Sequence, residues 1–105
     1  ELGGIQIPER SEHSEHVFHQ YTLRVENDRD ELQEYLKGKG IPTMVYYPVP
    51  IHSQKAYSKF FTEPNSCPVT DQLVGEVLSL PISTEMDSEQ LNYIVEGIKE
   101  FIKIK

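Results

Sequence analysis

Residues 78–102, LSLPISTEMDSEQLNYIVEGIKEFI, decide the fold because they join a short apolar strand to an amphipathic helix. Residues 78–82 have the length and composition of a buried strand. Asp87 and Gln90 have the spacing of a capping box, so the helix is predicted to begin directly after Asp87. Its apolar residues recur every three or four positions, which is typical of a helix with one buried face: Leu91, Ile94, Val95, Ile98, Phe101 and Ile102.

The chain before residue 41 predicts another strand and another helix. Residues 16–25 alternate with period two, which is typical of a strand with one buried face. Asp28 and Glu31 also fit a capping box, and Gly40 can adopt the left-handed conformation that ends a helix. A helix is therefore predicted over about residues 29–39.

The middle of the chain predicts a strand that is interrupted by prolines. Residues 41–47 are rich in β-branched and aromatic side chains, and Pro48 and Pro50 end the strand because neither can donate a hydrogen bond to a neighbour. A short helix is expected over about residues 53–60, followed by a turn-rich connection over residues 62–67.

Pro68 suits the first turn of a third helix, in which Val69, Leu73 and Val77 have the spacing of core residues. The predicted order is thus strand, helix, strand, short helix, helix, strand, helix. This order favours an α+β fold, in which a small, mostly antiparallel sheet has helices packed on one face.

The length of 105 residues predicts one domain. We expect residues 1–15 to form a linker with an entering strand and residues 16–105 to form the α+β core. The chain opens without a methionine, inside an apolar segment, which favours an excised piece of a longer protein over a processed whole one.

Composition excludes several classes of protein. A net charge of -7, with no basic run longer than two residues, argues against a nucleic-acid partner. No window approaches the roughly 20 consecutive apolar residues of a membrane span, and no signal segment leads the chain, so a cytoplasmic protein without a membrane partner is expected. Cys67 is the only cysteine, so no internal disulfide can form.

Two possible chemical sites are not favoured by the sequence. His13, His16 and His19 suggest a metal site, but strand residues three apart point to opposite faces, so no metal is expected. Cys67 has no local general base, and an inert cysteine is favoured over a catalytic one.

The clearest candidate site is a corner where phenol, imidazole and amide groups surround two prolines. Such groups can bind a small polar ligand, and prolines reduce the entropy lost on binding. The alternative is that one tyrosine packs in the core while the other lies on the surface. The corner comprises Tyr46, Tyr47, Pro48, Pro50, His52, Gln54 and Tyr57.

Four segments, in this order, resemble the C-terminal part of the DegT/DnrJ/StrS family of sugar aminotransferases. Together they cover nearly the whole chain. The segments are HVFHQYTLRV at 16–25, RDEL through GIPT at 29–43, YYP-x-PIH-x-Q-x-AY at 46–57 and LSLP at 78–81.

The resemblance implies the small C-terminal domain of a fold-type I aminotransferase, which uses pyridoxal 5'-phosphate. The family's Schiff-base lysine and most of its cofactor contacts lie in an N-terminal large domain that has no counterpart here. No catalytic or cofactor-binding residue is therefore assigned, and the isolated chain is expected to bind no cofactor and to be inactive.

The resemblance also implies a role for the corner in binding a nucleotide-linked keto-sugar. Tyr46 and Tyr47 match positions that reach the nucleotide-sugar, His52 matches a substrate-contacting histidine of some members, and Gln54 is the next candidate. The parent would be a homodimer that transfers an amino group, typically from glutamate, in surface-polysaccharide or amino-sugar biosynthesis.

A different class of function stays open. A non-enzymatic α+β module could bind a protein partner through its exposed sheet face and the Tyr-Pro corner, because aromatics and prolines also suit protein interfaces.

Overall fold

The centre of the computed structural model, which describes residues 3–61 and 67–105, is an antiparallel sheet with the strand order β1-β2-β3. Ile5 of β1 pairs with Val25, and Leu23 of β2 pairs with Leu78 of β3. The expected small antiparallel sheet is therefore confirmed. The strands are β1 Ile5–Gln6, β2 Tyr21–Val25 and β3 Val77–Leu80; the helices are α1 Arg29–Gly38, α2 Pro68–Glu76 and α3 Ser88–Ile104; the 3-10 turns are η1 Ile51–Ser53 and η2 Lys55–Tyr57.

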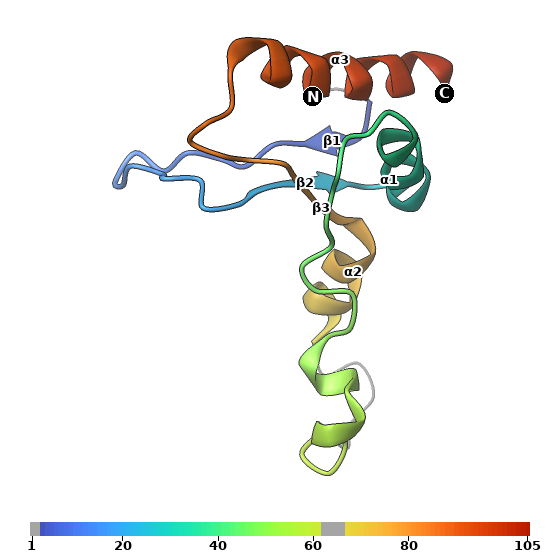
Figure 1. Cartoon of the computed structure of the whole chain (residues 1–105). Coiled ribbons are helices and arrows are strands. Elements are labelled where there is room, and N and C mark those ends of the chain that lie inside the picture. Colours follow the sequence, from blue (N-terminus) through green and yellow to red (C-terminus); the bar gives the residue numbers. More distant parts are fainter. Residues whose placement is uncertain (1–2, 62–66) are drawn as a thin grey trace.

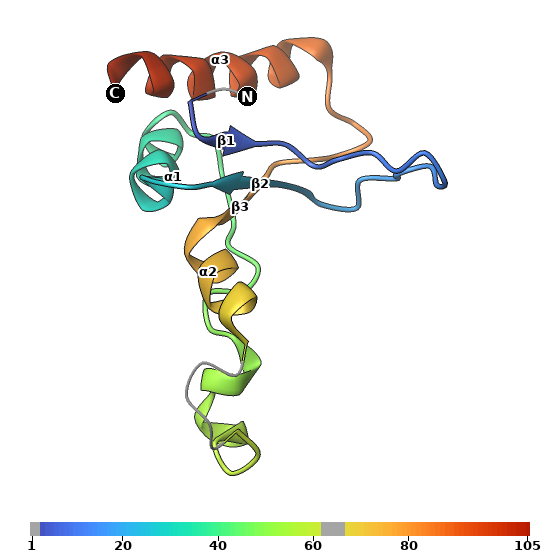
Figure 2. The ribbon, with the colours of Figure 1, turned by 180° about the vertical axis from the view of Figure 1, so that it is seen from behind.

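Two parts of the chain project from this centre (Figure 1). The connection between β1 and β2 extends to one side of the sheet, and α2 with η1 and η2 extends away from α3 (Figure 2). We call residues 45–61 together with α2 the arm. Within residues 3–61 and 67–105, no helix combines the length and apolar character needed to cross a membrane.

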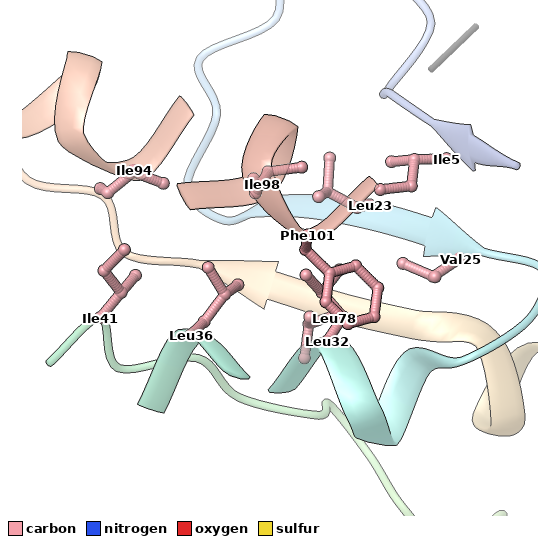
Figure 3. Packing of buried hydrophobic residues seen from close by; sticks show 10 residues of the cluster. All are labelled: Ile5, Leu23, Val25, Leu32, Leu36, Ile41, Leu78, Ile94, Ile98 and Phe101. Atoms are coloured by element: carbon pink, nitrogen blue, oxygen red, sulfur yellow. The ribbon is translucent and has the colours of Figure 1, made fainter. Parts of the chain in front are cut away.

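One face of the sheet packs against α1 and α3 and forms the core (Figure 3). Leu32 and Leu36 of α1 and Leu78 of β3 have no exposed surface. The prediction that helices cover one face is confirmed. The other buried members are Ile5, Leu23, Val25, Ile41, Ile94, Ile98 and Phe101.

The capping box of α3 is present as predicted. The Gln90 amide donates to Asp87 Oδ1 at 2.8 Å, and the Asp87 amide donates to Gln90 Oε1 at 3.1 Å. Ile94, Ile98 and Phe101 are buried, whereas Leu91 and Val95 were wrongly assigned to the buried stripe and are exposed because they flank it.

The start of α1 differs from the prediction, whereas its end agrees. Asp28 has a left-handed φ of 60° and makes no side-chain cap bond, so the capping box with Glu31 is wrong. Both carboxylates instead contact the ammonium group of Lys105, the residue that directly follows α3. At the other end, Gly40 has a φ of 74°, and the Ile41 amide donates to the Leu36 carbonyl at 2.9 Å, which closes the helix in a Schellman motif.

Two predicted strands are shorter in the structure. β2 begins only at Tyr21, because Phe18 has a φ of 46° and donates its amide to His16 Nδ1, and Val17 is 86% exposed. Residues 41–47 form only one bridge, between Met44 and Ser79. A pattern of β-forming residues shows that a segment can form a strand, but it does not show whether a neighbouring strand is there to pair with it.

The expected helix at 53–60 is replaced by the turns η1 and η2, because Gln54 between them is extended. Most of the connection predicted over 62–67 lies outside the described residues. α2 begins at Pro68 as predicted, but Val69 is 68% exposed and not in the core. Leu73 and Val77 are half-buried.

The sheet face opposite the core carries polar pairs. Thr22 and Ser79 oppose each other across β2 and β3, and their hydroxyl groups lie 2.8 Å apart. Arg24 Nε donates to Glu76 at the end of α2. Ser79 is only 5% exposed, so its hydroxyl depends on this pairing.

Thr43 allows a test of the energetics of buried hydroxyl groups. Among the described residues, its buried Oγ1 has no hydrogen-bond partner, although its carbonyl accepts from Gln33 Nε2 at 3.3 Å. Removing an unpaired hydroxyl removes a desolvation penalty, so Thr43→Val should leave stability unchanged or raise it by up to about 1 kcal/mol in urea unfolding. The matched Thr22→Val should destabilise by about 1–3 kcal/mol because it leaves Ser79 unpaired. A larger loss in Thr43→Val than in Thr22→Val would contradict this reading.

Glu76 predicts a pH dependence. Hydrogen bonds, first from Arg24 and then from Gln72, hold the pKa of Glu76 below its ordinary value of 4.5. A carboxylate with a lowered pKa in the folded state stabilises the protein above the unfolded pKa, and this contribution disappears as the pH falls through the folded pKa. Glu76→Gln should therefore lower Tm at neutral pH, and the difference from wild type should vanish in acid.

The control for this thermal titration is Glu34→Gln. Glu34 pairs with Lys37 at 3.0 Å, but both side chains are more than two-thirds exposed, so little change in Tm is expected at any pH. If Glu76→Gln still has a lower Tm than wild type, by the same amount, in acid, the loss of stability comes from packing and not from the ion pair.

Candidate functional site

A hollow of about 310 Å³ lies in the arm, between the Tyr-Pro corner and α2. Thr70, Leu73 and Val74 of α2 form one wall together with Val77. The opposite wall comes from the corner and consists of Tyr46, Tyr47, Val49, Pro50, Ile51 and Gln54. Three of the four predicted site residues therefore line one hollow.

Local backbone bonds shape the corner wall. Pro50 precedes η1, and its carbonyl accepts from the Ser53 amide at 3.0 Å. Gln54 Nε2 donates to the Val49 carbonyl at 3.4 Å, which closes the loop across Pro50 and leaves Gln54 Oε1 as an acceptor. The peptide bond between Tyr46 and Tyr47 is cis.

Tyr46 and Tyr47 both line this hollow, and each carries an aromatic ring and a hydroxyl group. Their rings are 5.5 Å apart in an edge-to-face arrangement. Tyr47 is 73% exposed and Tyr46 is 39% exposed, and neither hydroxyl makes a hydrogen bond within residues 3–61 and 67–105. Tyr46 also borders a second hollow of about 450 Å³, which reaches Ser79 and His19. These groups can donate to or accept from a polar ligand.

His52 is placed differently from the other three predicted residues. Its side chain is 11% exposed, its Nε2 lies 2.7 Å from Asp71 Oδ1, and its ring meets the edge of Phe61 with 6.1 Å between centroids. It does not line the hollow beside Tyr46 and Tyr47. The structure brings the tyrosines and Gln54 together and sets His52 against α2.

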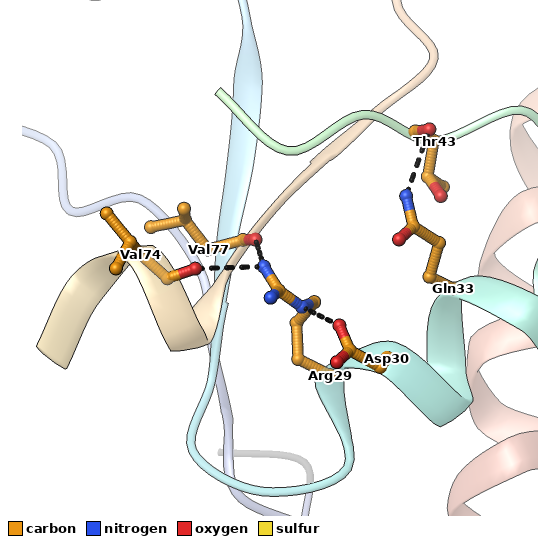
Figure 4. A network of polar contacts seen from close by, with 6 residues as sticks. All are labelled: Arg29, Asp30, Gln33, Thr43, Val74 and Val77. Atoms are coloured by element: carbon orange, nitrogen blue, oxygen red, sulfur yellow. Dashed lines mark hydrogen bonds and ion pairs between the residues drawn. The ribbon is translucent and has the colours of Figure 1, made fainter. Parts of the chain in front are cut away.

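Arg29 fixes the C-terminal end of α2, which lies next to β3 (Figure 4). Its Nη1 donates to the carbonyls of Val74 and Val77 at 3.2 and 3.0 Å, and its Nε donates to Asp30. The last carbonyls of a helix have no partner within the helix, so the guanidinium supplies what α2 lacks. Arg29 thereby positions the wall that carries Val74.

The sequence interpretation missed both Arg29 and Asp71. Asp71 lies 19 residues after His52, and no local pattern links the two. Arg29 belongs to one of the segments that resemble the aminotransferase family, and this was the only sign in the sequence that it could matter. Its hydrogen-bond partners lie 45 and 48 residues away, so no local pattern predicts the contacts.

Other suggested sites do not assemble. No group of three His, Cys, Asp or Glu side chains in the described residues could hold a metal ion. His16 stacks on Phe18 with 4.1 Å between ring centroids. A larger hollow of about 550 Å³, lined by Pro42, Met86 and Tyr93 among others, contains none of the predicted site residues.

Known proteins similar to this chain include sugar aminotransferases and a regulatory protein. Residues 1–99 match the profile of the DegT/DnrJ/EryC1/StrS aminotransferase family. A pleiotropic regulatory protein of Geobacillus stearothermophilus is 47% identical over 88 residues, which are 84% of this chain and 23% of that protein. The dTDP-3-amino-3,6-dideoxy-alpha-D-galactopyranose transaminase of Aneurinibacillus thermoaerophilus is 38% identical over 97 residues, which are 92% and 26%.

A solved structure gives the same result. The crystal structure of DesV from S. venezuelae superposes with a TM-score of 0.90 at 33% identity, covering 97% of this chain and 27% of that one. The expected fold, that of the small domain in fold-type I aminotransferases, is confirmed. The chain spans about a quarter of the length of these relatives.

Arg29→Lys tests the anchor of α2. A lysine ammonium lacks the planar fork that reaches two carbonyls and Asp30 at once, so we expect a loss of about 1–2 kcal/mol in urea unfolding. Lys37→Arg, on the exposed side of α1, serves as the control and should not change stability measurably. Equal stability of the two variants would show that the Arg29 contacts contribute little.

Proposed function

This chain belongs to the DegT/DnrJ/EryC1/StrS aminotransferase family, and we propose that it is the C-terminal part of an enzyme that aminates a nucleotide-linked keto-sugar. The observation that carries the proposal is the single hollow lined by Tyr46, Tyr47 and Gln54. Relatives named as sugar transaminases support it. The amino donor is proposed to be glutamate, and the product to serve surface-polysaccharide or amino-sugar biosynthesis.

The residues of this chain do not fit pyridoxal 5'-phosphate, which aminotransferases of this family use and which supplies the amino-group chemistry when bound. None of its seven lysines lines the hollow. Lys37, Lys39, Lys99 and Lys105 pair with carboxylates on helix surfaces. The Schiff-base lysine and the residues that bind the cofactor are therefore proposed to lie in a large domain outside this chain. The isolated chain is proposed to be inactive.

The corner residues that line the hollow are proposed as the substrate-side wall, and Tyr57 is not among them. The phenol hydroxyls of Tyr46 and Tyr47 and the free amide oxygen of Gln54 can hydrogen-bond pyrophosphate or sugar hydroxyl groups. The exposed ring of Tyr47 can pack against the apolar face of a sugar. His52 is proposed to belong to the same wall, behind the residues that line the hollow.

The assembly and location of the parent enzyme are proposed as well. The chain spans about a quarter of the length of its relatives. The remaining walls of the substrate site are therefore proposed to come from the large domain. The parent is proposed to be a homodimer in the cytoplasm, without a nucleic-acid or membrane partner.

Tyr47→Phe in the full-length enzyme tests the proposed wall. Loss of one neutral hydrogen bond should lower kcat/KM for the nucleotide-sugar by about tenfold. The half-reaction with glutamate, followed in a stopped-flow spectrometer, should keep its rate. Tyr57→Phe removes the same hydroxyl from an arm residue outside the hollow and should change neither half-reaction. Equal losses in both half-reactions would argue against a sugar-side role.

A second candidate is a non-catalytic module that binds a protein partner. Two observations favour it: Ile51, Phe60 and Val69 of the arm are each more than 60% exposed, and one relative is named a regulatory protein. The gene that encodes this chain distinguishes the candidates. An upstream large α/β domain with a Schiff-base lysine supports the enzyme, and its absence supports the module.

A further inference from the structure

The contact between His52 and Asp71 joins the two walls of the hollow. His52 lies in η1 on the corner side, and Asp71 lies in the first turn of α2. Their side chains meet at 2.7 Å, although 19 residues separate them. A carboxylate accepts hydrogen bonds, so His52 Nε2–H is the donor in this contact.

Both ends of the α2 wall are therefore fixed. Arg29 binds the carbonyls of Val74 and Val77 at the end near the sheet. Asp71 binds His52 at the far end. Between these two anchors, α2 has no fully buried residue that would hold it by packing alone. The C-terminal end of α2 is also held by the contact between Arg24 and Glu76, so His52 is the polar contact that holds the opposite, N-terminal end beside the hollow.

His52 is poorly placed to meet a ligand in this hollow. Its side chain is 11% exposed, its Nε2 is already bonded, and Phe61 lies against its ring. By contrast, Tyr47 is open and lines the hollow. Tyr47 is therefore placed to contact a ligand in the hollow, whereas His52 lies outside the lining of the hollow.

We propose that His52 and Asp71 form a clasp that sets the distance between α2 and the corner, and that His52 serves the sugar-binding wall through Asp71 and not by touching the substrate. This inference rests on the proposed function and adds Asp71 as a positioning residue for it. The clasp holds Tyr47 and Gln54 in the positions from which they bind the substrate. This preorganisation lowers the free-energy cost of substrate binding and affects the chemical step less.

Because the clasp is one hydrogen bond between two residues, it predicts how the single and double variants of His52 and Asp71 compare. Asp71→Ala and His52→Ala each break the same contact, so each should raise KM for the nucleotide-sugar by about fivefold to tenfold. The double variant should be no worse than either single one, because residues that act as a unit are not additive. Asp71→Asn retains an oxygen that accepts from Nε2–H and should recover a KM within about twofold of wild type.

The measurements use the full-length enzyme. They comprise KM and kcat for the nucleotide-sugar, the rate of the glutamate half-reaction as evidence of an intact fold, and the ¹⁵N NMR shifts of the His52 ring. Both alanine variants should retain kcat and the glutamate rate, and Asp71→Ala should shift the Nε2 resonance. Glu89→Ala is the matched control, because Glu89 is an exposed carboxylate in the first turn of α3. It should leave KM unchanged.

Several results would overturn the clasp. They are an unchanged KM in Asp71→Ala, a His52→Ala effect much larger than that of Asp71→Ala, or a double variant whose losses multiply. The last two would assign His52 a direct substrate contact.

If the wild-type protein uses no nucleotide-sugar, the proposed function fails by itself. The clasp is then decided by hydrogen exchange of the Ser53 and Gln54 amides, which donate to Pro50 and Ile51. Faster exchange in Asp71→Ala supports the clasp, and unchanged exchange overturns it.

Discussion

Burial of one sheet face under α1 and α3 is the constraint on which the remaining structure depends. Leu78 of β3 is fully buried against Leu32 and Leu36 of α1, and Phe101 of α3 closes the same cluster. Apolar burial contributes roughly 25 cal/mol per Å², so this layer supplies the main favourable term in folding. The sheet has only short strands, and it is this cover that keeps them paired.

The arm is stabilised in a different way. Among the described residues, neither α2 nor the turns η1 and η2 contains a buried side chain. Their positions depend on directional contacts, chiefly those of Arg29 with the end of α2 and of His52 with Asp71. The molecule therefore combines a body held by packing with an arm held by hydrogen bonds, and the candidate site lies in the arm.

Local signals explain which parts of the structure could be predicted. The start of α3 follows from Asp87 and Gln90, because a capping box lies within four residues. The corner was recognisable because prolines and tyrosines are adjacent in the chain. Residues 16–20 were wrongly assigned to a strand, since alternation does not show where pairing stops. Asp71 could not be found, because its only relation to His52 is tertiary.

The separation between body and arm has a consequence for how such a domain can change over evolutionary time. A substitution in the core affects the packing on which every strand depends, whereas most arm positions are exposed and bear little of the folding free energy. The arm can therefore accept new side chains around the hollow while the body remains folded. Ligand preference can diversify on this scaffold without each change first having to be compensated elsewhere in the chain.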